Sequence, residues 1–362
     1  MTTTDFKRRP RLVDVCADRD NHFNLIRMLA ASGVLVSHAF PIALGRGAEE
    51  PLQRALDGVS LGTVCVYVFF AISGFFIAQS FERTSTFERF VRARVLRLFP
   101  ALAVVLAATA MAGAALTSAA AGAYWPEAAA YTVRNLTLFF LRWDLPGVFD
   151  ANPYGTPING SLWTLSYEVL CYGGVALAGL IGALRSRMVT ALIVLAAVLA
   201  FIALKGSDAP GRLRLLADLG LPFAFGAGAY VWREKIVLDG RIAAVLAIAA
   251  LAARLAPGAE AAFHPLFILA LSYTVFWLGY MPFRAFLTYN RLGDYSYGVY
   301  IYAFPTQQLA ASWGAVDPMT NIAMAAAMTL PCAVLSWHFV EKPALSLKSA
   351  RLPFWPLRGR RS

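Results

Sequence analysis

Residues 59–80 read VSLGTVCVYVFFAISGFFIAQS, a stretch without one charged side chain. A helix needs roughly 20 consecutive apolar residues to cross the hydrocarbon core of a bilayer. The stretch therefore predicts a membrane-spanning helix. Apolar runs of similar length recur on both sides of it, and 59% of the 362 residues are hydrophobic. The chain is predicted to be an all-α, polytopic transmembrane bundle.

About ten spans are predicted, and Gly or Pro interrupts several of them, which membrane helices tolerate. The spans cover residues 25–44, 59–80, 96–118, 161–182, 188–204, 213–231, 241–256, 263–280, 293–312 and 321–340. Three regions follow from them: a basic N-terminal segment, 1–20, a transmembrane domain, 21–343, and a basic tail, 344–362. Between the third and fourth spans, residues 119–160 are expected to form a long outer loop without obvious structure. Its apolar stretch 131–141 is too short to span and is expected to lie in the interface or to re-enter from it.

The net charge of +11 is explained by the topology expected of a membrane protein. Lys and Arg are concentrated in alternate connecting segments, and cytoplasmic loops of membrane proteins are rich in both. This distribution predicts that the N-terminus and the C-terminus are cytoplasmic, and it makes membrane lipid rather than nucleic acid the expected partner. The four cysteines lack CxxC spacing, so neither a disulfide framework nor a metal site is expected.

The first predicted span contains two ionisable side chains, Arg27 and His38, eleven residues apart. Eleven residues are close to three helical turns, so both project from one face, about 16 Å apart along the axis. An ionisable group inside a span suggests function, and a neutral imidazole can take a proton from a hydroxyl. The structural alternative is a histidine bonded to a neighbouring helix, with Arg27 merely reaching the membrane surface.

Arginines are also concentrated where the third span begins. Arg94 and Arg97 share a helix face, and Arg92 precedes them. Planar guanidinium groups suit phosphate recognition, so the three are candidate ligands for a phosphate-bearing donor that arrives from the cytoplasm. The alternative is a topology signal or a contact with anionic lipid.

Residues 159–168, which open the fourth span, read NGSLWTLSYE. Ser161, Thr164 and Glu168 lie at i, i+3 and i+7 and form one polar stripe on an apolar helix. By helical rise, Glu168 lies about 10–14 Å below the outer surface, at a depth similar to that of His38. A carboxylate there can orient an imidazole or stabilise its protonated form. The alternative is a structural pair with some other helix.

A tyrosine-rich stretch opens the ninth span, where residues 293–305 read GDYSYGVYIYAFP. Such residues form either an aromatic belt or a wall that contacts a sugar or an acyl chain. Near the end of the tenth span, His338 and Glu341 are expected to anchor the helix rather than to catalyse. The candidate substrate-binding residues are Ser161, Trp163, Tyr167, Tyr297 and Tyr300.

Taken together and in this order, these segments resemble the acyltransferase 3 family of bacterial membrane O-acyltransferases, over residues 24–343. The resemblance rests on six motifs: Arg27 and His38 with ten residues between them, FFxxSGF at 69–75, RxxRxxP at 94–100, NxSLWxLxxE at 159–168, SYGxY at 296–300 and ExP at 341–343. It implies ten helices, cytoplasmic acyl-CoA as the donor, and an extracytoplasmic glycan or lipid-linked sugar as the acceptor. It also implies roles: His38 as the essential catalytic histidine, Arg27 as its companion, and Arg94 and Arg97 at the donor site.

One position departs from the family pattern. Many members carry a histidine in the penultimate span where this chain has Ala303, so roles inferred for that histidine do not carry over. The variant is similar to exopolysaccharide, O-antigen and nodulation-factor acetyltransferases. That similarity implies acetyl as the acyl group, acyl-CoA as a co-substrate rather than a permanently bound cofactor, and the bacterial inner membrane as the location.

A transporter or flippase for a glycan or lipid-linked precursor is the competing hypothesis. It predicts internal repeats and a wide polar pathway through the bundle. No repeat is visible in the sequence, and the charges within spans are few. The sequence therefore favours an enzyme.

Overall fold

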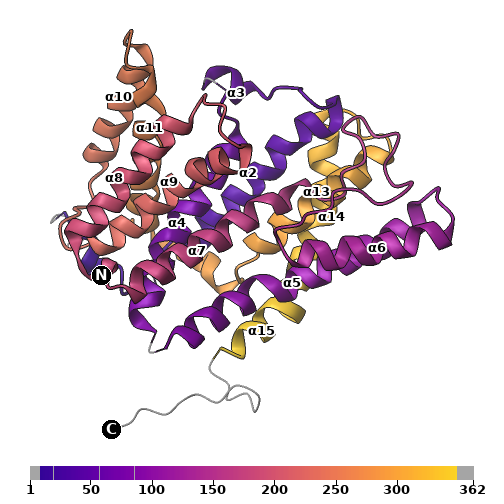
Figure 1. Cartoon of the computed structure of the whole chain (residues 1–362), viewed down its shortest axis with the longest axis horizontal. Coiled ribbons are helices and arrows are strands. Elements are labelled where there is room, and N and C mark those ends of the chain that lie inside the picture. Colours follow the sequence, from indigo (N-terminus) through magenta and orange to yellow (C-terminus); the bar gives the residue numbers. More distant parts are fainter. Residues whose placement is uncertain (1–8, 19, 57, 85, 349–362) are drawn as a thin grey trace.

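Helices correspond to all ten predicted spans. The structure, a computed structural model, describes residues 9–18, 20–56, 58–84 and 86–348, and the predicted basic positions outside these ranges are not described. The longer helices are α2 (Phe23–Leu44), α4 (Leu61–Arg83), α5 (Phe87–Leu116), α6 (Ala121–Leu136), α7 (Trp163–Leu180), α8 (Arg187–Leu204), α9 (Gly211–Val231), α10 (Gly240–Leu255), α11 (Glu260–Gly279), α13 (Ser296–Ser312) and α14 (Pro318–Ser336) (Figure 1).

Short elements connect or extend these helices. They are α1 (Leu12–Val15), α3 (Pro51–Ala55), α12 (Arg284–Leu287) and α15 (Lys342–Ser346), the 3-10 turns η2 (Gly160–Leu162), η3 (Ala183–Arg185) and η4 (Thr288–Arg291), and the π-helical turn η5 (Trp337–Glu341). No strand occurs in the described ranges, so the predicted all-α class is confirmed.

Six helical stretches in the described part of the chain are long and apolar enough to cross a membrane: α2, α4, α5, α8, α11 and the continuous stretch Pro318–Ser346. The other four predicted spans coincide with α7, α9, α10 and α13. Of these, α10 and α13 have only 16 and 17 residues, and α9 contains two arginines and an aspartate. The number of ten spans and the orientation of the termini stay predictions.

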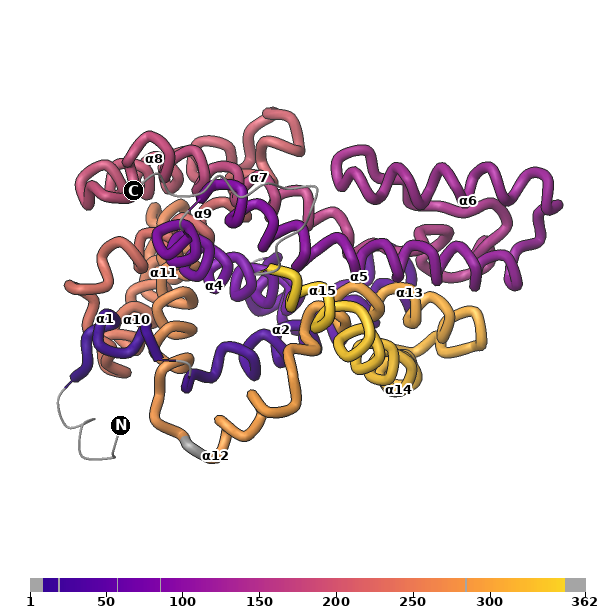
Figure 2. Tube along the Cα trace, turned by 90° about the horizontal axis from the view of Figure 1, so that it is seen from below, coloured from indigo at the N-terminus to yellow at the C-terminus, as the bar shows by residue number. Residues whose placement is uncertain are grey.

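The segment 119–160 differs from the unstructured loop that was expected. It contains α6, which packs back along α5 (Figures 1 and 2). Tyr124, Ala128 and Tyr131 are its buried face, and their spacing of four and three residues is that of an amphipathic helix. The hydroxyl of Tyr124 donates to the carbonyl of Ala110 at 2.6 Å. Sequence hydropathy missed this helix because its 16 residues are too few to cross a bilayer.

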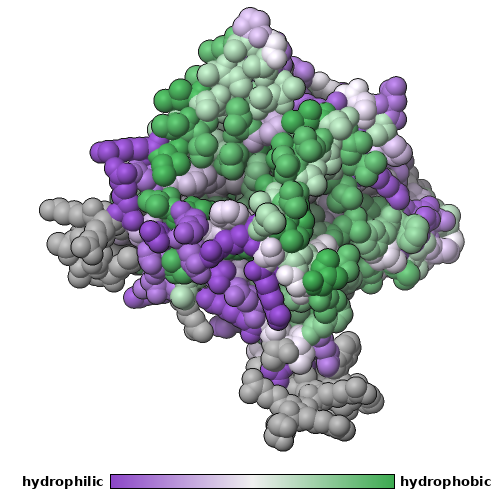
Figure 3. Space-filling model, turned by 60° about the vertical axis from the view of Figure 1, so that its left-hand side comes forward, coloured by the Kyte–Doolittle hydropathy of each residue, from purple (hydrophilic) through white to green (hydrophobic). Residues whose placement is uncertain are grey.

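Apolar side chains face outward over much of the bundle. Of the 18 residues of α8, only Thr190 and Phe201 are buried, although the helix contains little but aliphatic residues after its first turn. Figure 3 shows hydrophobic side chains spread across one face, with hydrophilic ones gathered below and to the left. Monomeric soluble proteins rarely expose apolar patches of this extent, whereas acyl chains of lipid cover them at no cost. The chain is a multi-pass membrane protein.

The helix α4 is central and packs against α2, α7, α9 and α11. Its contact with α9 is made backbone to backbone, because a Cβ added at Gly74 would overlap the carbonyl of Phe223, and one at Gly226 would overlap that of Ala71. Small residues allow such close approach of membrane helices. Gly74 and Gly226 therefore allow the close approach of α4 and α9.

Segments predicted to be cytoplasmic meet at one end of the bundle. The N–H of Leu12 donates to the carbonyl of Ile236 in the α9–α10 link at 2.8 Å, and the side chain of Gln79, near the end of α4, donates to the carbonyl of Cys16 at 2.9 Å. We call this the inner end. The opposite, outer end contains α3, α6 and the segment 137–159.

Candidate functional site

The helix α2 carries the two ionisable residues singled out in the first span. It is continuous from Phe23 to Leu44, so Arg27 and His38 lie on one face, about 16 Å apart along the axis by helical rise. Arg27 is near the inner end and His38 nearer the outer end. The predicted register of this pair is confirmed.

His38 lies where three cavities meet. The cavities have volumes of about 1010, 280 and 270 Å³, and His38 lines all three. Its ring packs edge-on against Phe304, with ring centroids 5.4 Å apart. Its Nδ1 atom is buried and has no hydrogen-bond partner among the described residues. A half-buried imidazole with open space on several sides is placed to meet a reactant rather than to tie helices together.

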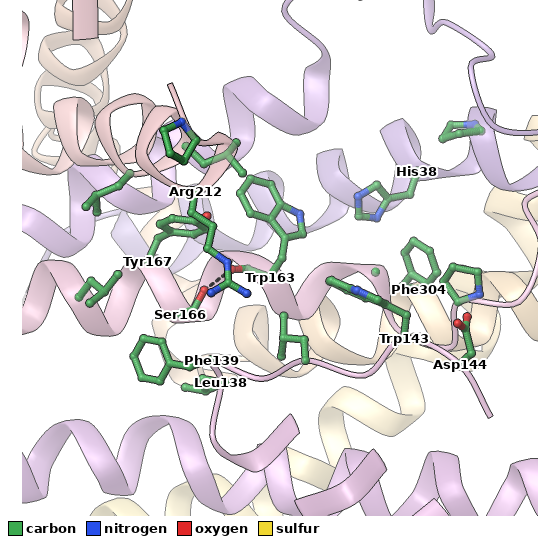
Figure 4. Close-up of a pocket in the computed structure, with 18 of the residues that line it drawn as sticks. His38, Leu138, Phe139, Trp143, Asp144, Trp163, Ser166, Tyr167, Arg212 and Phe304 are labelled. Carbon is green, nitrogen blue, oxygen red and sulfur yellow. Dashed lines mark hydrogen bonds between the residues drawn. The ribbon is translucent and has the colours of Figure 1, made fainter. Parts of the chain in front are cut away.

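The largest of these cavities, which we call the outer cavity, is lined by aromatic, polar and aliphatic side chains. Figure 4 shows His38, Trp143, Asp144 and Phe304 at one end, Arg212, Ser166 and Tyr167 with Leu138 and Phe139 at the other, and Trp163 between the two. Aromatic faces combined with a few polar groups are suited to sugar rings. Trp163 and Tyr167, predicted as substrate-binding residues, therefore line the outer cavity.

Ser161, Tyr300 and Thr164 form a hydrogen-bonded group deeper in the bundle. The hydroxyls of Thr164 and Tyr300 are 2.6 Å apart, and Tyr300 also donates to the carbonyl of Ser161 at 3.2 Å. Thr164 and Tyr300 line both the 280 Å³ cavity and a second, smaller space. They form the partition between the surroundings of His38 and the inner half of the protein, while Ser161 stands behind them.

The smaller space, which we call the inner chamber, has a volume of about 50 Å³. Its lining residues include Arg27, Ser73, Arg97, Glu168, Tyr172, Tyr297 and Tyr300. Tyr297, another predicted substrate-binding residue, donates to the carbonyl of Leu98 at 2.9 Å. The motifs from α2, α4, α5, α7 and α13 thus converge on this one space.

An ion cluster closes the inner end of the chamber. Asp294 Oδ2 accepts from Arg27 at 3.2 Å and from Arg97 at 2.6 Å, and its Oδ1 accepts from Ser296 at 2.6 Å. Arg97 also lies 3.5 Å from Glu341. Because Asp294 and Arg97 are only 12% and 14% exposed, the cluster is a largely desolvated pairing of charges. Glu341 therefore takes part in this cluster, beyond the anchoring role that the sequence suggested.

Glu168 belongs to the inner chamber rather than to the surroundings of His38. It accepts from Ser73 at 3.1 Å and from the hydroxyl of Tyr172, and it lines none of the three cavities that touch His38. No hydrogen bond joins Glu168 to His38 among the described residues. The sequence analysis paired Glu168 with His38 because of their similar depth. In the structure the two side chains line different cavities.

Arg94 and Arg92 differ in their surroundings from Arg97. The guanidinium of Arg94 lies 5.9 Å from the ring centroids of both Phe90 and Tyr172 and makes no ion pair within the described ranges. Arg92 is buried and donates to the carbonyl of Lys348. Desolvation and the positive charges of Arg94 and Arg97 lower the pKa of Lys348 to about 8. We call the region around Arg92, Arg94, Arg97 and Lys348 the inner mouth; basic side chains are concentrated there.

Sequence reasoning missed Asp294 as a functional residue. It stands directly before the SYGxY block, at the edge of a predicted span, and three arginines were predicted for the same side. An acidic residue at a membrane boundary opposite several cations signals an ion pair. Asp218 and Arg212 on α9 also escaped notice, because that helix carries no motif.

These features define a class: a multi-pass helical membrane protein with a histidine between an outer, aromatic cavity and an inner, arginine-lined mouth. Residues 20–338 match the family model described as an acyltransferase domain. The chain belongs to the acyltransferase 3 family, and it is an O-acyltransferase.

Two named proteins are similar over nearly their whole length. An O-acetyl transferase of Shigella phage Sf6 is 30% identical over 352 residues, which cover 92% of this chain and 98% of that protein. Nodulation protein 10 of Rhizobium leguminosarum bv. viciae is 26% identical over 372 residues, which cover 91% and 94%. No solved structure matches the chain. The family membership and the first of these relatives support an enzyme over the competing transporter.

Proposed function

We propose that this protein transfers an acetyl group from cytoplasmic acetyl-CoA to a hydroxyl of an envelope or exported glycan, across the bacterial inner membrane. The observation that carries the proposal is the position of His38, which opens to the outer cavity on one side and connects toward the arginine-lined chamber on the other. The relative named an O-acetyl transferase supports acetyl as the acyl group.

The donor is assigned to the inner end. The positive-inside rule places this end in the cytoplasm, where acyl-CoA is made. Arg94, Arg97 and Arg92 surround its mouth and match the phosphate groups of CoA in charge and geometry. The thioester arm then points along α2, past Arg27 and Tyr297, toward His38.

The acceptor is assigned to the outer cavity. Trp143, Trp163, Tyr154 and Tyr167 provide flat faces for sugar rings, and Arg46, whose Nε donates to the carbonyl of Tyr154 at 2.8 Å, holds one wall in place. A volume of about 1010 Å³ is at the upper end of the range for small-molecule sites, which fits a segment of glycan. Tyr300 lies deeper, in the partition below His38, and Ser161 supports it from behind.

The chemistry needs one base and no further cofactor. A neutral His38 takes the proton of the acceptor hydroxyl as that oxygen bonds to the thioester carbonyl carbon. The carbon–sulfur bond then breaks, and the thiolate of CoA receives the proton from the imidazolium. The products are an acetyl ester and free CoA thiol, so protons and charge balance.

Glu168 is proposed to act as a counter-charge in the inner chamber. Arg27, Arg94 and Arg97 bring three positive charges to the chamber and its mouth, and Glu168, Asp294 and Glu341 bring three carboxylates. A balanced set lowers the cost of keeping charges inside the membrane. Phosphates of the donor add negative charge at this point, which the partly unpaired Arg94 is placed to meet.

The test uses radiolabelled acetyl-CoA with envelope membranes from a strain lacking the gene as the source of acceptor. The purified protein should move label into the glycan fraction, and mass analysis should find the corresponding acetyl mass on the glycan. His38→Ala should lose about 10²- to 10⁴-fold of this activity, the usual contribution of a general base. His338→Ala, at an exposed histidine, is the matched control and should be unaffected. Transfer by His38→Ala at the wild-type rate contradicts the mechanism.

A further inference from the structure

A further carboxylate, Asp218, lies inside the bundle and has no part in the reaction described so far. It belongs to α9, and its Oδ1 accepts a hydrogen bond from the hydroxyl of Tyr67 on α4 at 2.6 Å. Ionisable groups inside membrane helices are rare, and they mark function unless a structural partner accounts for them. One hydrogen bond leaves most of the acceptor capacity of a carboxylate unused.

Asp218 lines the 280 Å³ cavity that also contains His38. The other polar side chains that line this cavity are Trp163 and five hydroxyl-bearing residues, Ser37, Ser60, Thr63, Thr164 and Tyr300. Asp218 is the one carboxylate on its lining, and it faces the same space as the imidazole. A polar cavity of this size has room for several water molecules, since one water takes about 30 Å³ of liquid volume. Such waters can connect the carboxylate to the ring.

Asp218 also borders a cavity of about 400 Å³ on its other side, together with Lys205 and Arg214. A purely structural hypothesis therefore exists, in which the carboxylate only balances these cations. The bond to Tyr67 ties the carboxylate to α4, and Thr63 and Val66 of the same helix line the cavity of His38. The contact between α4 and α9 at Gly74 and Gly226 holds both residues in register.

We propose that Asp218, held by Tyr67, stabilises the protonated His38 across the shared cavity and is the negative partner that the sequence assigned to Glu168. The inference rests on the proposed function, since the imidazolium exists only after His38 has taken the proton of the acceptor hydroxyl. The proton then passes to the CoA thiolate as described above, and Asp218 itself exchanges none. It is a positioning residue, because it acts through His38 and touches neither substrate.

The experiment measures turnover and the donor KM for Asp218→Asn, with radiolabelled acetyl-CoA and membranes from the gene-deleted strain. Turnover should fall roughly 10- to 100-fold, as expected for losing one charge at a separation of several ångströms in a medium of effective dielectric constant about 20. The donor KM should stay unchanged, because the arginine mouth is untouched. Asp218→Glu should regain much of the turnover, and Tyr67→Phe should lose less than Asp218→Asn.

Three comparisons decide the outcome. Asp208→Asn, at an exposed aspartate in the preceding loop, should behave as the wild type. Lys205→Gln should leave turnover near the wild-type value; a loss equal to that of Asp218→Asn overturns the proposal in favour of a structural pair. Full turnover in Asp218→Asn, with His38→Ala still inactive, also overturns it and leaves the acetyltransferase function standing. Wild-type activity in His38→Ala instead contradicts the proposed mechanism, and absence of acetyl transfer by the wild-type protein contradicts the proposed function itself.

Discussion

Asp294 is the residue on which the two arginines of the inner chamber depend. One of its oxygens accepts from both Arg27 and Arg97, and the other accepts from Ser296. Two like charges held so close in a desolvated site repel each other unless the carboxylate stands between them. Asp294 therefore neutralises both arginines and holds the cluster together, and Glu341 is a second ion-pair partner of Arg97.

Replacing this carboxylate should therefore destabilise the protein. We expect Asp294→Asn to lower the free energy of unfolding by about 3 kcal/mol, the lower end of the range for removing one partner of a buried pair, because Arg27 is 27% exposed. Labelling of the buried thiols Cys16 and Cys65 during heating in detergent reports the shift. Asp20→Asn, at an exposed aspartate, serves as control. Equal stability of the two variants contradicts the claim that Asp294 holds the cluster together.

Arg94 offers a cleaner probe of donor binding than Arg97. Arg97→Ala removes the partner of Asp294 and Glu341, so its effects on binding and on stability are mixed. Arg94→Ala should raise the KM for acetyl-CoA about 10-fold or more, since a hydrogen bond to a charged group contributes about 1.5–3 kcal/mol, and it should leave thiol labelling unchanged. Arg185→Ala, at an exposed arginine, is the control. An unchanged KM for acetyl-CoA in Arg94→Ala contradicts a role in donor binding and leaves Arg94 only its contribution to membrane topology.

At the residue scale, the sequence predicted which ionisable residues lie inside the bundle, but not which of them contact one another. Arg27 and Arg97, which the sequence singled out on two different helices, meet at Asp294, while their roles and that of His38 stay predictions. Glu168 was assigned to His38 because both lie at a similar depth in the membrane. Depth alone does not predict which neighbouring helix a side chain faces. Asp218 carries no motif, so only the packing of α9 against α4 brings it into the cavity of His38.

Among the elements, α4 and α9 form the tightest unit of the bundle. Their backbones touch at two glycines, Gly74 and Gly226, and a methyl group at either position has no room. Gly74→Ala and Gly226→Ala should each cost at least about 1–3 kcal/mol, the range for overpacking, and more where the backbone cannot move.

A control for these variants lies on the same helix. A Cβ at Gly220 meets nothing within 4 Å, so Gly220→Ala should be neutral or stabilise by up to about 0.5–1 kcal/mol through reduced backbone entropy in the unfolded state. Thiol labelling during heating compares the three. If Gly74→Ala is as stable as Gly220→Ala, the close contact of α4 with α9 is not a requirement of the fold.

Elements were predicted well where hydropathy alone identifies them. All ten predicted spans are helices, because long apolar runs have few other solutions in a membrane. The helix α6 was missed, since its stability comes from packing against α5 and not from a continuous apolar run. The π-helical turn Trp337–Glu341 was also beyond prediction, as its extra residue per turn leaves no periodic signal; such turns frequently occur at functional sites, and this one carries Glu341.

At the scale of the whole molecule, the distribution of basic residues predicts that both termini lie in the cytoplasm. The segments predicted to be cytoplasmic meet at the inner end, as spans of alternating direction require. Alkaline phosphatase, which is active only outside the cytoplasm, should be inactive when fused after Ser362 and active when inserted after Gly206. Activity at position 362 contradicts the prediction of ten spans with both termini inside.

The inner chamber, at about 50 Å³, holds little more than one water molecule's share of liquid volume, about 30 Å³. In the proposed orientation it separates two aqueous compartments between which a voltage is maintained. An enzyme that draws its two substrates from opposite sides of a membrane must also be an insulator, because a continuous file of water past Tyr300 would conduct protons and discharge that voltage. The narrowness of the chamber thus protects the energy supply of the cell, and each catalytic cycle has to admit the thioester arm without letting current through behind it.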